Sequence, residues 1–124
     1  MKPILLIFAV AAFSTLTAQT EARATYAANG KLIEVTDLQG LQTCSVSNVS
    51  GKVSKVKATD SSARVVLKRE EDAVEFEIPL SNVKADDKTA MFKHLVTKGN
   101  TLEIAGYRCT EGSAPSAFSV RRVY

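Results

Sequence analysis

The chain contains no tryptophan, one histidine and two cysteines in 124 residues. A structural zinc site needs four ligands, which His94 and two cysteines outside any Cys-x-x-Cys pair do not supply. The G-x-S-x-G motif of serine hydrolases is also missing, and no nucleophile has a base and an orienting group at recognisable spacing. His94 lies beside Lys93 and off the apolar stripe of its segment, as a solvated histidine does. We therefore expect no catalytic residue, no metal and no cofactor, and hence a protein that is not an enzyme.

Long hydrophobic runs are also scarce. Residues 4–13 form an unbroken apolar run, but a membrane-spanning helix needs about 20 such residues. Lys2 precedes the run, and Ala22-Arg23-Ala24 after it has the small-x-small pattern that signal peptidase recognises. We interpret residues 1–24 as an export signal that is removed, and we expect a periplasmic or secreted protein without a transmembrane segment in its mature chain.

The chain also lacks a large excess of positive or negative charge. The formal net charge is +3, and the lysines and arginines are interspersed with acidic residues. Nucleic-acid binders usually carry a basic stripe, so an ordinary mixed surface is the simpler interpretation.

The two cysteines are Cys44 and Cys109. In an oxidising compartment an isolated pair of cysteines most often forms one disulfide. A metal-binding pair or a reactive thiol would be the alternatives. Export favours the disulfide.

The chain after the export signal divides into a lead and a domain. Residues 25–43 are an N-terminal lead with a possible short strand around Leu32, Ile33 and Val35. Residues 44–58 carry valines at irregular spacing around Gly51, a pattern that predicts one long bent strand, because glycine in a strand often marks a bulge or sharp coil.

Strict alternation of apolar and polar residues then predicts a hairpin. Its inward positions are Val65, Leu67, Val74, Phe76 and Ile78. Inward positions must pair with inward positions, and this parity rule allows Leu67 to pair with Phe76 or with Val74. A loop over residues 70–73 favours Leu67 with Phe76, and it places Lys68 opposite Glu75 as a favourable cross-strand pair.

Residues 86–98 are predicted to form a helix, with Asp86 as its cap and Gly99 as its stop. Its apolar stripe consists of Met91, Phe92, Leu95 and Val96. Two further strands are expected over residues 101–109 and 116–124.

The resulting order is three strands, a helix and two strands. This is the layout of the OB-fold, a five-stranded Greek-key barrel with a helix between strands 3 and 4, here over residues 44–124. In that barrel the beginning of strand 1 lies beside the end of strand 4. These two places hold Cys44 and Cys109, so the topology supports the disulfide.

Residues 95–109, read as LVTKGNTLEIAGYRC, resemble the L-x-x-G-x-x-V-x-V-x-G segment of bacterial OB-fold proteins. They are similar to exported proteins related to the tRNA-anticodon-binding type of OB domain, over roughly residues 50–124. The resemblance implies a fold, and it carries over no catalytic residue.

We therefore expect an exported, non-enzymatic OB-fold module that binds a macromolecule or a small ligand in the cell envelope. The expected contact area is the face of the two hairpin strands with the bordering loops 59–62 and 110–116. The candidate ligand-binding residues are Lys55, Lys57, Arg64, Lys68, Glu75 and Glu77. Nucleic acid is not the expected partner, because Arg64 and Lys68 should be neutralised by Glu75 and Glu77 and because the phenylalanines sit at core positions. The alternative is a secreted inhibitor or interaction protein that acts through the exposed loop 110–116. The sequence does not identify the protein or small ligand that is bound.

Overall fold

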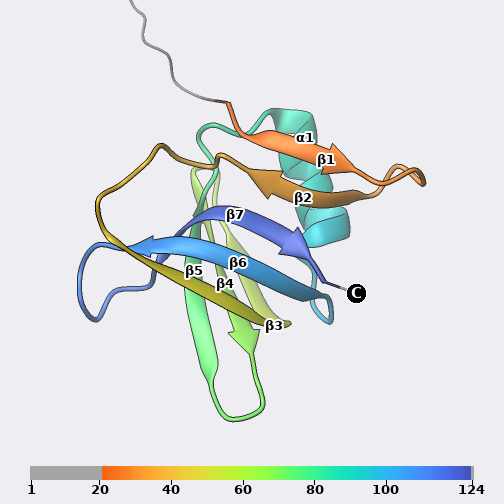
Figure 1. Cartoon of the computed structure of the whole chain (residues 1–124). Coiled ribbons are helices and arrows are strands. Elements are labelled where there is room, and N and C mark those ends of the chain that lie inside the picture. Colours follow the sequence, from red (N-terminus) through yellow and green to blue (C-terminus); the bar gives the residue numbers. More distant parts are fainter. Residues whose placement is uncertain (1–20, 124) are drawn as a thin grey trace, which may run out of the picture.

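The protein is described by a computed structural model over residues 21–123, so all of the predicted export signal except residues 21–24 lies outside the described residues. The described chain is mainly β and forms one seven-stranded sheet with a short helical segment (Figure 1). The elements, in chain order, are β1 (Arg23–Tyr26), β2 (Leu32–Thr36), β3 (Ser45–Ala58), β4 (Ser62–Lys68), β5 (Ala73–Pro79), α1 (Ala85–Ala90), the π-helical turn η2 (Met91–Leu95), β6 (Thr101–Arg108) and β7 (Ser116–Arg122).

Five of the strands pair in a closed ring. β3 pairs with β4, β4 with β5, β7 with β6, and β6 with β3, all antiparallel. The ring is completed by a parallel bridge between β5 and β7. The prediction of a five-stranded barrel is wrong in its strand number, because β1 and β2 extend the sheet beyond β7. The helix follows the fifth strand of the sheet instead of the third.

The additional strands arise from the N-terminal lead, where β2 is the short strand predicted around Leu32, Ile33 and Val35, and β1 was not predicted. Leu32, Val35 and Leu38 are fully buried in the core, so β2 is an integral part of the sheet. β1 begins before the predicted cleavage point at Ala24, and the Ala22 N–H donates to the carbonyl of Asn82 at 2.9 Å. The N-terminal residues are thus held by packing and hydrogen bonds that sequence periodicity does not reveal.

A side-chain bond also fastens β1 to the helix. The Tyr26 hydroxyl donates to a carboxylate oxygen of Asp87 at 2.6 Å. This hydrogen bond is the main reason that the pKa of Tyr26 is raised to about 12, since losing the proton would remove the bond and bring two negative charges together. The β1–β2 hairpin and α1 are therefore joined at their solvent-exposed side.

The β4–β5 hairpin has the predicted inward face but not the predicted register. Val65, Leu67, Phe76 and Ile78 are all fully buried. The structure pairs Val65 with Phe76 and Leu67 with Val74, which is the other register that parity allows. Lys68 therefore faces Ala73, and its predicted pairing with Glu75 is wrong.

The turn of this hairpin explains the difference. The Arg69 N–H donates to the Asp72 carbonyl at 2.8 Å, and the two side chains form a two-bonded ion pair. This contact closes the turn over residues 69–72, one residue earlier than predicted.

The helical segment lies where it was expected but is shorter and differently built. α1 starts after Lys84, which makes no side-chain cap, so the predicted cap at Asp86 is wrong. The helix then widens into η2, where the Val96 N–H reaches the Met91 carbonyl at 2.6 Å. The widened turn still buries Met91, Leu95 and Val96 against the sheet.

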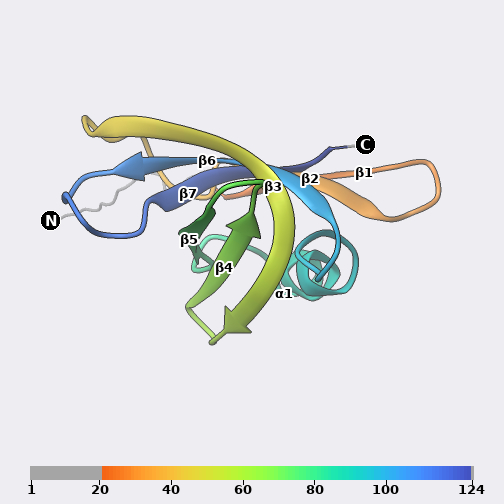
Figure 2. The same ribbon diagram turned by 90° about the horizontal axis from the view of Figure 1, so that it is seen from below.

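β3 is one long curved strand that takes part in two pairings (Figure 2). Its first half pairs with β6, its second half pairs with β4, and Lys52 belongs to both ladders. At the bend, a Cβ on Gly51 would lie 3.0 Å from the Lys68 carbonyl oxygen, so glycine permits the close crossing. Where β3 begins and β6 ends, Cys44 and Cys109 form the predicted disulfide with Cα atoms 4.8 Å apart.

Candidate functional site

The outer face of β3, β4 and β5 gathers the candidate binding residues. Side chains alternate across a strand, and the inward positions of β3 include Val53 and Val56, which face Leu67 and Val65 of β4. The outward positions are charged. We use the term lysine face for the five outward cations of β3 and β4, which are Lys52, Lys55, Lys57, Arg64 and Lys68.

The ladder arranges these side chains in three cross-strand rows. The rows are Lys52–Lys68–Ala73, Lys55–Val66–Glu75 and Lys57–Arg64–Glu77. All six predicted residues therefore share one face. Charge is sorted by strand, with lysines along β3 and glutamates along β5.

Two of the rows place like charges directly opposite each other. Lys52 faces Lys68, and Lys57 faces Arg64. Directly opposed like charges destabilise a sheet, whereas opposite charges would stabilise it. These pairs therefore lower stability at two places on one small surface.

Neutralisation of this face is only partial. Its one ion pair in the described part of the chain joins Arg64 to Glu75 at 3.6 Å, with both side chains about half exposed. Among residues 21–123, the ammonium groups of Lys52, Lys55, Lys57 and Lys68 make no hydrogen bond or ion pair. The expected cancellation of cations by glutamates holds at Arg64 and fails at Lys68.

An open hollow of about 480 Å³ lies at one end of the lysine face. Its lining includes Lys52 and Lys68, with Ser54 and Glu70 beside them. The opposed lysine pair therefore borders a concave surface that a small anionic group could enter.

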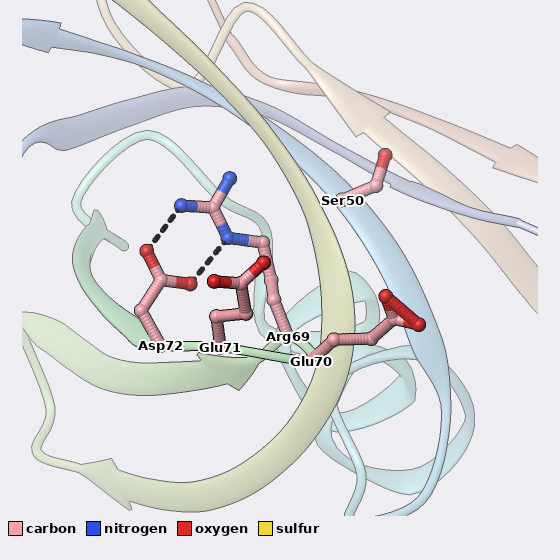
Figure 3. Close-up of a pocket in the computed structure, with 5 residues that line it drawn as sticks. All are labelled: Ser50, Arg69, Glu70, Glu71 and Asp72. Atoms are coloured by element: carbon pink, nitrogen blue, oxygen red, sulfur yellow. Dashed lines mark hydrogen bonds and ion pairs between the residues drawn. The ribbon is translucent and has the colours of Figure 1, made fainter.

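A second hollow, of about 580 Å³, lies next to it (Figure 3). Ser50 of β3 lines one side, and the hairpin turn lines the other with Arg69, Glu70, Glu71 and Asp72. Asp72 is bound to Arg69, which lowers the pKa of this carboxyl. No group of three or more His, Cys, Asp or Glu between residues 21 and 123 could hold a metal ion.

The loop 110–116 forms a separate surface beside β5. With Ala73 and Glu75 it lines a shallow hollow of about 320 Å³ that also includes Arg108. The Arg108 guanidinium donates to the Ser113 carbonyl at 3.3 Å and braces the loop. Sequence reasoning missed Arg108, because the last residue of a strand carries no periodic signal.

The aromatic residues lie away from the lysine face. Phe76 is fully buried as predicted, but Phe92 and Phe118 are only half-buried. Phe118 packs on Tyr107 with ring centroids 4.6 Å apart. The outward rows hold lysine, arginine, valine, glutamate and alanine, so they offer no ring on which a base could stack.

Comparison with known proteins identifies no relative, since no protein-family model matches the chain and no curated protein matches it significantly. Within residues 21–123, no helix is long and apolar enough to cross a membrane.

Proposed function

We propose that the protein is an exported, non-enzymatic binding module of the OB type, with its ligand site on the outer face of β3, β4 and β5. The closed circuit of five pairings, with the helix between β5 and β6, supports the OB assignment. The β1–β2 hairpin is then an addition to that fold. A disulfide in the described chain is compatible with a periplasmic or secreted protein.

The ligand is an anion, and the observation that carries this proposal is the pair of like-charge contacts on the lysine face. Repulsion between Lys52 and Lys68, and between Lys57 and Arg64, lowers stability, and in the described chain only Arg64 has an ion pair, with Glu75, to offset it. A negatively charged ligand would remove both penalties when it binds. A role in binding an anionic ligand would explain why these like charges face each other on β3 and β4.

An acidic polymer, such as a sulfated or uronate-containing polysaccharide, fits the face better than single-stranded nucleic acid. Three lysines follow one another along β3, so successive anionic groups can be met by one strand. Single-stranded nucleic acid is usually bound by stacking on aromatic rings, which the outward rows lack. The glutamates of β5 would repel a polymer that spread across the whole face, and this confines the ligand to β3 and β4.

The test is binding of a fluorescent heparin oligosaccharide to three proteins over a salt series. The wild type should bind, and Lys55→Gln/Lys57→Gln should lose at least about tenfold in affinity, with a shallower dependence on salt. Lys31→Gln/Lys98→Gln is the matched control, because it removes the same charge from exposed lysines elsewhere. Absence of binding by the wild type, or equal losses in both variants, would refute the anionic ligand. Tighter binding of an oligothymidylate than of heparin would show that the ligand is nucleic acid.

A second candidate function is that of an inhibitor or interaction protein acting through loop 110–116. The loop is tethered by the disulfide at Cys109 and braced by the bond from Arg108 to Ser113. A preorganised exposed loop loses less entropy when it enters a partner's cleft. Glu111→Ala should weaken such a complex and leave heparin binding unchanged, which separates the two candidates.

A further inference from the structure

The first strand of the sheet contains the bond at which the sequence predicts the export signal to be cut. That cut follows Ala24, but β1 already begins at Arg23. Ala24 pairs with Val35 of β2, which is fully buried, and its own side chain packs against the hydrophobic core. A cut after Ala24 would therefore remove the first half of this strand.

Ala22 is held more firmly still. Its side chain is 8% exposed and belongs to the hydrophobic core. Its N–H donates to the Asn82 carbonyl at 2.9 Å, in the connection between β5 and α1. A chain cut after Ala22 or Ala24 would lose both the core contact and this hydrogen bond, and buried backbone groups are normally paired.

Two ion pairs flank Ala22 and follow the same course. The Arg23 guanidinium lies 3.5 Å from the Asp37 carboxylate, and the Glu21 carboxylate lies 3.9 Å from the Lys84 ammonium. All four side chains are exposed, so these pairs contribute little to stability. They show that the domain makes specific contacts from Glu21 onward.

The sequence offers a second place for the cut, before the described residues begin. Signal peptidase cuts after a small residue that follows the apolar run of an export signal. Residues 14–20, STLTAQT, separate this run from Glu21 and contain a single alanine, Ala18. The other recognised position then falls on Leu16, which is larger than alanine but uncharged. Ala18 is also closer to the apolar run than Ala24 is.

We propose that the export signal ends at Ala18, so that the mature chain begins at Gln19 and keeps β1 whole. Signal peptidase acts on an extended chain, so the fold does not hide the bond after Ala24 from it. The fold instead shows what a cut there would remove, namely the core contact of Ala22, its bond to Asn82 and half of β1. This inference rests on the proposed export and is independent of the proposed ligand.

The test is the N-terminus of the protein that a bacterial host exports when it expresses the full chain. Intact mass, with peptide sequencing by mass spectrometry, should identify a periplasmic chain that begins at Gln19. A chain that begins at Arg23 or Thr25 would overturn the proposal and leave export standing. A chain that keeps Met1 and stays in the cytoplasm would overturn export and this cleavage site together.

Substitution of the two alanines gives a matched pair of variants. Ala18→Leu places a large residue where signal peptidase needs a small one, so it should abolish the cut that yields Gln19. Ala24→Leu makes the same change at the other bond and should leave processing unchanged. Pulse labelling measures the ratio of precursor to processed chain independently of later folding. Normal processing of Ala18→Leu together with a block in Ala24→Leu would overturn the proposal.

A deletion measures what the residues before Thr25 contribute. A precursor that lacks residues 19–24 places Thr25 directly after Ala18, so the same cut yields a chain that begins at Thr25. Compared with the wild type, this chain should unfold at a lower urea concentration or fail to accumulate, because Ala22 and half of β1 are missing. Equal unfolding midpoints would overturn the argument that the mature domain needs these residues.

Discussion

The two halves of β3 differ in what they present to solvent. In the described part of the chain, the first half (residues 45–51) carries no charge and pairs with β6 alone, and Val46, Asn48 and Ser50 are exposed. The second half is covered on its β4 side and exposes a lysine at each outward position. One strand thus presents two different surfaces, an uncharged edge and a row of lysines, on either side of Gly51.

The two halves of β3 differ because an unpaired edge and a cluster of lysines need different surroundings. Main-chain pairing needs an unprotected edge, and lysines close to that edge would hinder it. An anionic ligand needs clustered lysines, and these are tolerated where a second strand already covers the edge. Gly51 separates the two requirements, because the strand changes partners there.

The disulfide holds the far end of the first half, and its removal is expected to have the largest effect. Cys44→Ser/Cys109→Ser should lower the free energy of unfolding by about 4 kcal/mol in the chain-entropy description of cross-links. Urea unfolding of the variant and of reduced wild type should agree. A loss confined to reduced samples and absent from the double variant would contradict this account.

Substitution at the bend should be the next most harmful change. Gly51→Val should cost about 3 kcal/mol, because even its Cβ would meet the Lys68 carbonyl and the Leu67 Cβ at 3.0 and 3.1 Å. Gly40→Val, at a position with open space around the Cβ, serves as the control in the same urea experiment. Equal stabilities would mean that β3 changes partners without needing a glycine.

Truncating one valine in each half of β3 compares how deeply the two halves are buried. Val53→Ala in the covered half should cost about 2 kcal/mol, since Val53 is 2% exposed. Val46→Ala should lower the free energy of unfolding by at most a few tenths of a kcal/mol, because its side chain is largely in water. Thermal unfolding at low protein concentration measures both, and similar losses would refute the contrast.

The smallest expected effect is a gain in the free energy of unfolding. Lys57→Thr should stabilise the fold by about 0.5 kcal/mol at low salt, because it removes a cation opposite Arg64. Added salt should shrink the gain by screening. Lys55→Thr faces Val66 instead of a cation and should give no such gain. If both variants respond alike, the cross-strand repulsion argued for the lysine face is absent.

Sequence periodicity predicted which residues of the hairpin face inward, but not how they pair. A shift of two residues preserves the parity of Leu67, Phe76 and Val74, so parity alone allows two registers. The Arg69–Asp72 contact in the turn selects between them. The short strand predicted around Leu32, Ile33 and Val35 is β2, whereas β1 was missed because its four residues are too few for alternation to show.

The six candidate residues share one face in the structure, but the pattern of charges on that face was predicted less well. Alternation placed Arg64, Lys68, Glu75 and Glu77 on the outer face of the hairpin, and strand pairing adds Lys55 and Lys57 of β3 to the same face. The opposition of Lys68 to Lys52 depends on strand pairing between distant segments, and no local pattern encodes it. The disulfide was predictable because both cysteines lie at strand ends that the topology brings together.

The bridge between β5 and β7 has a mechanical consequence. Only Glu77 and Ser116 are in register there, and the Glu77 N–H bonds to the Pro115 carbonyl at 2.9 Å. The start of β7 is also clasped by the Gln39 side chain, whose amide reaches the Ser116 and Ala117 carbonyls. Because this boundary has one paired position whereas the other four boundaries of the ring each have six or more, we expect the ring to open here first. Opening there would leave the β4–β5 hairpin attached to the ring through the β3–β4 ladder alone, while the disulfide keeps β3 and β6 together.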